Sequence, residues 1–275
     1  MQSGALSLIH NREKSQNIAR RYAEILDINQ GGLEKLKRLD LKALFAAQGR
    51  VGAESPGTIP ASPWFDGDLV PGSLEEAVAN PAAPVPLVAG ATRDEIRLFE
   101  LMPGDILPSK WPDLEALLTR QLGPAHAARV LSAYPRTKAG RRALATDLTF
   151  FMPTRNFAHR HAAQQPTWFY RFDYSHPIAG ATHGLDLTLT WPMPSFRAAL
   201  ARGGSMKGKR AELGGRMTAH YAHFVRTLQA GPDWPAYSRH DKQVKIFNLE
   251  DRLEADPEAQ RFAAWAGSDA GPGLD

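Results

Sequence analysis

Three short apolar segments, separated by long helical stretches, constrain the fold of this chain more than any other feature. Residues 85–90, 167–174 and 244–248 have the length and composition of strands. Far more chain lies between them than a hairpin needs, which is typical of an α/β layer fold with a mostly parallel sheet. The third segment alternates apolar and polar residues, so we expect it half exposed, nearer the edge of the sheet.

Helical periodicity fills the intervals between these expected strands. It predicts helices at 13–27 and 33–48, a loop rich in Gly, Pro and Ser at 49–63, and further helices at 112–133, 139–163, 195–202, 211–230 and 257–266. Three strands form a small sheet compared with the number of helices that would pack against it, which suggests that other strands of the sheet are missing. We therefore interpret residues 1–275 as one partial domain, cut from a larger α/β fold with large helical insertions.

Composition and charge exclude several classes of partner. With 43% hydrophobic residues the chain can build a core, but Pro, Arg or Asp interrupts every apolar run, so we expect no membrane partner. The net charge of +4 is modest, and the basic groups at 136–142 and 207–210 carry no interleaved aromatic residues, which argues against nucleic-acid binding. The chain has no cysteine and no export-signal pattern at its start, which favours a cytoplasmic location.

Four segments, taken in order, resemble consecutive blocks of the type-B carboxylesterase and cholinesterase-like family. They are Met1–Ala5, Pro63–Pro71, Val85–Phe99 and Gly180–Asp186, and a Trp-Pro and Tyr block at Trp234–Tyr237 extends the resemblance. Together they span most of residues 1–266. The chain departs from the family at Ile96, where the family commonly has Gly, and at Trp191-Pro192, where it has an aromatic residue followed by Gly.

This resemblance implies the C-terminal part of an α/β-hydrolase fold and two members of a catalytic triad. Glu95 would be the carboxylate and His183 the histidine, in the chain order that such hydrolases use. Each follows an expected strand, so both could lie at the carboxyl ends of strands. Because the family's triads place the acid within hydrogen-bond reach of the imidazole, the resemblance implies adjacent side chains, at about 2.6–3.2 Å. The family's substrates are small carboxylic esters, and its chemistry needs no metal and no cofactor.

The nucleophile of such a triad is missing from the sequence. No Gly-x-Ser-x-Gly elbow occurs; Gly204-Ser205 and Gly267-Ser268 come nearest, and a glycine-rich oxyanion segment is absent as well. We therefore expect the chain to be catalytically silent alone. Removing half of a sheet bares interior strands, so we also expect an unsatisfied edge on strand 85–90 or 167–174, and self-association.

Other interpretations remain open at this point. The chain could be a non-catalytic cholinesterase-like binding module, or a small nucleotide-binding protein built around Gly203–Lys209, although Arg210 replaces the Ser or Thr of a phosphate-binding loop. His220 and His223 would share a helix face as metal ligands or as structural residues, whereas His159 and His161 point apart. Asp186 would be a hydrogen-bond acceptor in the histidine loop or a helix cap.

Overall fold

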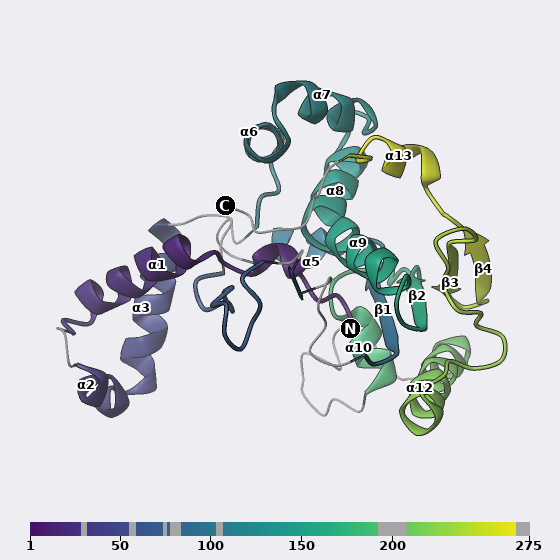
Figure 1. Ribbon diagram of the computed structural model, residues 1–275, viewed down its shortest axis with the longest axis horizontal. Helices are drawn as coiled ribbons and strands as arrows, with labels where there is room; N and C mark the ends of the chain where they lie inside the picture. The colour runs from purple at the N-terminus through teal and green to yellow at the C-terminus, as the bar shows by residue number, and fades with distance from the viewer. Residues whose placement is uncertain are drawn as a thin grey trace.

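A mostly parallel four-stranded sheet forms the centre of the computed structural model, which describes residues 1–28, 32–54, 59–73, 76–77, 84–102, 107–191 and 208–267 (Figure 1). Its strands are β1 (Leu87–Thr92), β2 (Thr167–Phe172), β3 (Gln243–Phe247) and β4 (Arg252–Ala255), in that spatial order. β1 pairs with β2 and β2 with β3 in parallel, whereas β4 pairs with β3 antiparallel. The predicted α/β class is therefore confirmed.

Helices cover both faces of this sheet. One face packs against the π-helical turn η2 (Asp147–Phe151) and α9 (Met152–His161). The same core continues away from the sheet through α6 (Trp111–Leu122), α7 (Pro124–Ser132), α8 (Lys138–Thr146) and α13 (Ala259–Ala263). The other face packs against α10 (Leu185–Thr190) and α12 (Lys209–Thr227), as Figure 1 shows. Successive β2 residues alternate between the layers: Phe169 joins the first core, and Trp168, Tyr170 and Phe172 join the second.

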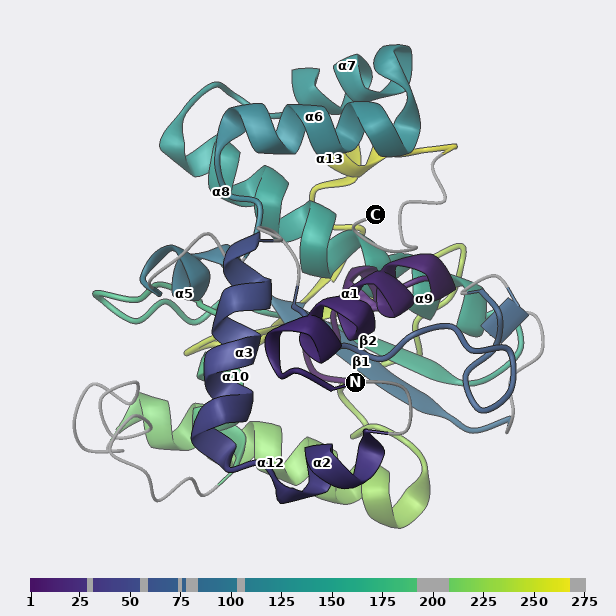
Figure 2. The ribbon, with the colours of Figure 1, turned by 90° about the vertical axis from the view of Figure 1, so that its left-hand side faces the viewer.

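An arm of helices at the N-terminal end lies away from the sheet. It consists of α1 (Arg12–Ile25), α2 (Leu33–Arg38) and α3 (Leu41–Glu54), with α1 packed against α3 (Figure 2). Asn11 caps α1 by accepting a hydrogen bond from the Lys14 N–H at 2.8 Å. Phe45 and Leu41 on α3 remain more than 60% exposed. The arm therefore contributes little to either core.

Residues 1–3 run parallel to β1 along its outer side. Gln2 bridges to Gly90, the Ser3 N–H donates to the Gly90 carbonyl at 2.8 Å, and the Met1 amine donates to the Val88 carbonyl at 2.6 Å. β1 and β2 are thus paired on both sides, so the predicted unsatisfied edge on strand 85–90 or 167–174 is wrong. Self-association stays a prediction, which light scattering of the purified chain would test.

Several other boundaries differ from the sequence predictions. Strand 244–248 lies near the edge of the sheet as expected, since only β4 lies beyond β3, but its predicted half exposure is wrong, because Val244 to Phe247 are buried. The expected helix 33–48 is two helices, and α3 runs on to Glu54 through Gly49 and Gly52 into the expected loop. Gly123, whose positive φ of 76° favours glycine, divides helix 112–133 into α6 and α7. The expected helix 195–202 lies outside the described residues.

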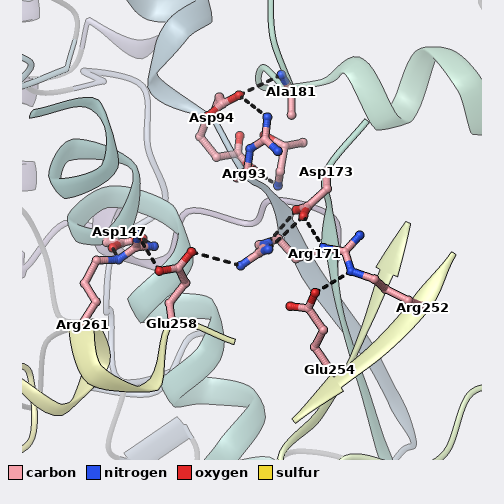
Figure 3. Close-up of polar contacts among 12 residues, drawn as sticks. Arg93, Asp94, Asp147, Arg171, Asp173, Ala181, Arg252, Glu254, Glu258 and Arg261 are labelled. Atoms are coloured by element: carbon pink, nitrogen blue, oxygen red, sulfur yellow. Dashed lines mark hydrogen bonds and ion pairs between the residues drawn. The ribbon is translucent and has the colours of Figure 1, made fainter. Parts of the chain in front are cut away.

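A network of ion pairs links the sheet to the C-terminal elements (Figure 3). Arg171 of β2 makes a bidentate contact with Asp173, at 2.6 and 2.8 Å, and both side chains are buried. Arg252 of β4 contacts the same carboxylate at 3.3 Å, and Arg171 lies 3.9 Å from Glu258 beside α13. The buried charges of Arg171 and Asp173 are thus paired with each other, and Arg252 and Glu258 extend the network to β4 and α13.

No helix in the described part of the chain has both the length and the apolar character needed to cross a membrane. The longest of these helices, α12, carries charged and histidine side chains along its 19 residues.

Candidate active site

Glu95 and His183 lie side by side at the carboxyl ends of β1 and β2. Glu95 follows the turn that ends β1 and begins α5 (Ile96–Glu100); its side chain is fully buried. His183 lies in the loop between β2 and α10, and the left-handed Gly184 follows it directly. The His183 Nδ1 and the Glu95 Oε2 are 2.5 Å apart, so the contact expected between residues 88 positions apart in sequence is present.

The remaining oxygen of Glu95 is also fully engaged. Oε1 accepts a hydrogen bond from the Thr92 N–H and another from the Ser3 hydroxyl, each at 2.6 Å. Three donors from three parts of the chain thus converge on one buried carboxylate. Because carboxylate oxygens accept hydrogen bonds, we assign the ring proton of His183 to Nδ1, which leaves Nε2 as the basic nitrogen.

Two phenylalanine rings hold the imidazole of His183. The ring of Phe99 from α5 lies 5.2 Å from it between centroids, and that of Phe150 from η2 lies 5.0 Å away. Its side chain keeps 29% of its surface exposed. Burial lowers the pKa of His183, but the hydrogen bond and negative charge of Glu95, helped by Asp186, outweigh burial and raise this pKa above its usual value.

Asp186 is a second buried carboxylate beside this pair. It lies in the first turn of α10, where the Leu187 N–H donates to it at 2.9 Å and the Tyr170 hydroxyl at 3.1 Å. Burial, with the charge of Glu95, raises the pKa of Asp186 to about 6. Of the two roles weighed from the sequence, Asp186 has that of a hydrogen-bond acceptor and not that of the helix cap, because Gly184 is the N-cap of α10. The carboxyl also lies within electrostatic range of His183.

The raised pKa of Asp186 predicts a specific pH dependence of stability. Since the folded state holds this proton more tightly than the unfolded state, Asp186 lowers the free energy of unfolding as pH rises from about 4 to 6. Asp186→Asn removes the ionisation of this buried group and is expected to raise the free energy of unfolding at pH 7.5 by about 2 kcal/mol. That figure already subtracts the loss from the weaker hydrogen bond that an amide accepts. Urea denaturation at pH 4 and 7.5 measures it; Asp113→Asn, in the first turn of α6, is the exposed control. An equal gain at both pH values would contradict this prediction.

Ser3 is a site residue that sequence reasoning missed. It is buried, and its backbone has the unusual positive φ of 49°. The available signal is the Met1–Ala5 block, which belongs to the resemblance but by itself indicates no role for Ser3. Its contact with Glu95 joins residues 92 positions apart, and local sequence patterns do not report such contacts.

The alternative sites gain no support from the described residues. His220 packs against the rings of Trp234 and Phe247, and its Nε2 lies 3.7 Å from Asp233. His159 and His161 contact different partners, Tyr237 and Thr167. Across the described ranges, no three His, Cys, Asp or Glu side chains are grouped as metal ligands. Most of the Gly203–Lys209 segment, with Ser205 and Ser268, lies outside the described residues.

Comparisons with known proteins agree with the geometry. A profile described as the carboxylesterase family matches residues 1–265. The para-nitrobenzyl esterase of Bacillus subtilis is 28% identical over 271 residues, which is 95% of this chain and 55% of the relative. A solved PNB esterase structure superimposes with a TM-score of 0.81 at 27% identity, over 98% of this chain and 56% of that one. A thermophilic PNB esterase gives a TM-score of 0.80 at 27% identity, over 96% and 56% of the two chains.

The matched proteins also define how much of the fold is present. This chain spans about 55% of the length of the curated relative it matches, and it superimposes on a similar share of the solved esterases. Its mostly parallel sheet and flanking helices are those of the α/β-hydrolase fold of these esterases. The chain therefore belongs to the carboxylesterase family.

Proposed function

We propose that this chain is the part of a serine carboxylic ester hydrolase that supplies the acid and the histidine of the catalytic triad. Glu95 orients His183, and His183 takes a proton from the attacking serine and returns it to the leaving alcohol. The observation that carries the proposal is the 2.5 Å contact between the His183 Nδ1 and the buried Glu95 carboxylate. The substrates proposed are small carboxylic esters.

The attacking serine is proposed to lie outside these 275 residues. The sequence has no Gly-x-Ser-x-Gly elbow, and Ser3, the serine in contact with Glu95, donates its proton to the acid rather than to the histidine. A hydroxyl on the far side of the acid from His183 Nε2 is not placed for proton transfer to that nitrogen. The nucleophile must approach His183 from its partly exposed side.

The chain alone is expected to hydrolyse a short p-nitrophenyl ester no faster than buffer. Without a nucleophile, the covalent route through an acyl-enzyme is closed, whatever the state of Glu95 and His183. Release of p-nitrophenolate by the purified chain, compared with its His183→Ala variant, measures this. Turnover well above buffer that disappears in His183→Ala would mean that a serine within the 275 residues attacks the ester.

A second experiment adds the N-terminal segment, with its nucleophile, that the chain is proposed to lack. The N-terminal part of the Bacillus subtilis para-nitrobenzyl esterase, joined ahead of Met1, is expected to produce ester hydrolysis that His183→Ala abolishes. The matched control carries a Ser→Ala change in the added segment's nucleophile elbow. A folded joined protein without activity would favour the alternative, a non-catalytic cholinesterase-like binding module.

A further inference from the structure

The loop that carries His183 is attached to the loop that carries Glu95 by two hydrogen bonds, one between backbone groups and one to a side chain. The Asp94 N–H donates to the Ala181 carbonyl at 2.9 Å, and the Ala181 N–H donates to the Asp94 carboxylate at 3.1 Å. Figure 3 shows Asp94 and Ala181 joined in this way. Asp94 and Ala181 are immediate or near neighbours of Glu95 and His183, so these bonds fix one end of the histidine loop.

The rest of the histidine loop is a tight turn over residues 176–180. The Gly180 N–H donates to the His176 carbonyl at 2.9 Å, and the His176 N–H donates back to the Gly180 carbonyl at 3.1 Å. The Nδ1 of His176 accepts from the N–H groups of Ile178 and Ala179, each at 3.2 Å. Gly180 has a φ of +69°, in the left-handed region that favours glycine. The turn is thus internally well ordered.

Arg97 crosses this turn from α5, two residues after Glu95. Its Nη2 donates to the Ile178 carbonyl at 2.7 Å. Its guanidinium lies directly over Gly180, because a Cβ added to Gly180 would be 2.2 Å from the Arg97 Nη1 and 2.8 Å from its Cζ. The absence of a side chain at position 180 therefore makes the space that the Arg97 guanidinium occupies.

We propose that Arg97 is a positioning residue for His183, which clamps the 176–180 turn to the element that carries Glu95. Together with the Asp94 to Ala181 pair, it makes two attachments between the acid loop and the histidine loop. A charge-assisted hydrogen bond to a backbone carbonyl is stronger than a neutral one, and Arg97 itself is anchored because its backbone N–H donates to the Asp94 carbonyl at 3.0 Å. The catalytic meaning of this clamp rests on the roles proposed for Glu95 and His183.

The test observes the His183 to Glu95 contact in this chain, without any ester. A short histidine to carboxylate hydrogen bond shifts the Nδ1 proton far downfield in an NMR spectrum, and the His183→Ala variant assigns that signal. Arg97→Ala is expected to broaden or lose the signal and to lower the pKa of His183, because Glu95, which raises that pKa, is no longer held in contact. Arg97→Lys, which keeps a donor for the Ile178 carbonyl, is expected to restore the signal in part.

The control removes an equal charge away from both loops. Arg226 is exposed in the last turn of α12, so Arg226→Ala is expected to leave the His183 signal in place. If Arg97→Ala leaves both the signal and the titration of His183 unchanged, the proposal is overturned, even where the melting temperature falls. The ester assays decide the proposed function separately, because they do not report on this proton.

A pair of substitutions tests the contact itself. Gly180→Ala places a Cβ against the Arg97 guanidinium, so it is expected to lower the melting temperature more in the native background than in Arg97→Ala. The strain of a left-handed alanine is common to both backgrounds and cancels. Equal effects in the two backgrounds would show that Arg97 does not occupy the space beside Gly180, and the clamp would be excluded.

Discussion

Glu95→Gln is expected to reverse the tautomer of His183 and, in the joined protein, to reduce kcat by about 10⁴-fold. The reason lies in the donors around Oε1. The Thr92 N–H and the Ser3 hydroxyl both donate to that oxygen, so an amide at position 95 turns its carbonyl toward them. Its NH₂ group then faces the His183 Nδ1, which must become an acceptor, and the proton moves to Nε2.

Tautomer and rate can be measured separately for this variant. The ¹⁵N shifts of the two ring nitrogens of His183 report the tautomer in the chain alone, and p-nitrophenyl ester hydrolysis reports the rate in the joined protein. Glu212→Gln makes the same chemical change at an exposed position in the first turn of α12, and is expected to alter neither. A variant that kept Nδ1 protonated and retained its rate would show that the charge of Glu95 is dispensable.

Gly90→Val is expected to destabilise the chain by more than about 3 kcal/mol. Gly90 lies in β1, and a Cβ there would be only 2.2 Å from the Tyr170 ring. That ring cannot withdraw, because Trp234, Phe247 and Tyr221 surround it and its hydroxyl is bonded to Asp186. Any displacement of Tyr170 therefore reaches the carboxyl beside His183.

Thermal and urea denaturation measure the effect of Gly90→Val. Gly215→Ala is a suitable control, since Gly215 lies inside α12 and an added Cβ there meets no atom within 4 Å. It is expected to raise stability by up to about 1 kcal/mol, from helix propensity alone. A well-folded Gly90→Val chain with native stability would contradict the close packing of β1 against β2.

The elements that sequence analysis located best are those whose signal is local. β1 and β2 are short apolar runs between turns, and their bounds lie within two residues of the predicted 85–90 and 167–174. β4 was missed because Arg252–Ala255 is short, polar and largely exposed, and only its pairing with β3 makes it a strand. The single helix expected at 139–163 changes register at η2, where the buried Asp147 accepts from the Tyr134 hydroxyl at 2.6 Å.

The same distinction between local signals and long-range contacts applies to the candidate site. Glu95 and His183 stand in motifs that resemble those of a known family, so the resemblance implied their adjacency, with which chain order and strand placement agree. Ser3, and the link from Asp186 to Tyr170, depend on contacts between segments that the sequence does not place together. The Arg97 contact with Gly180 is of this second kind, because only the folded loop brings the two residues into contact.

The helical arm of α1, α2 and α3 has a consequence for how the chain responds to proteases and to hydrogen exchange. Since α1 packs mainly on α3 and neither adds much to the cores, the arm is expected to open at a lower free energy than the sheet does. Its amides would exchange first, and cleavage would begin there. Such a cut would leave Met1–Ser3 hydrogen-bonded along β1. Ser3 would therefore keep its hydrogen bond to Glu95 even after the covalent link between residues 1–3 and the rest of the chain is lost.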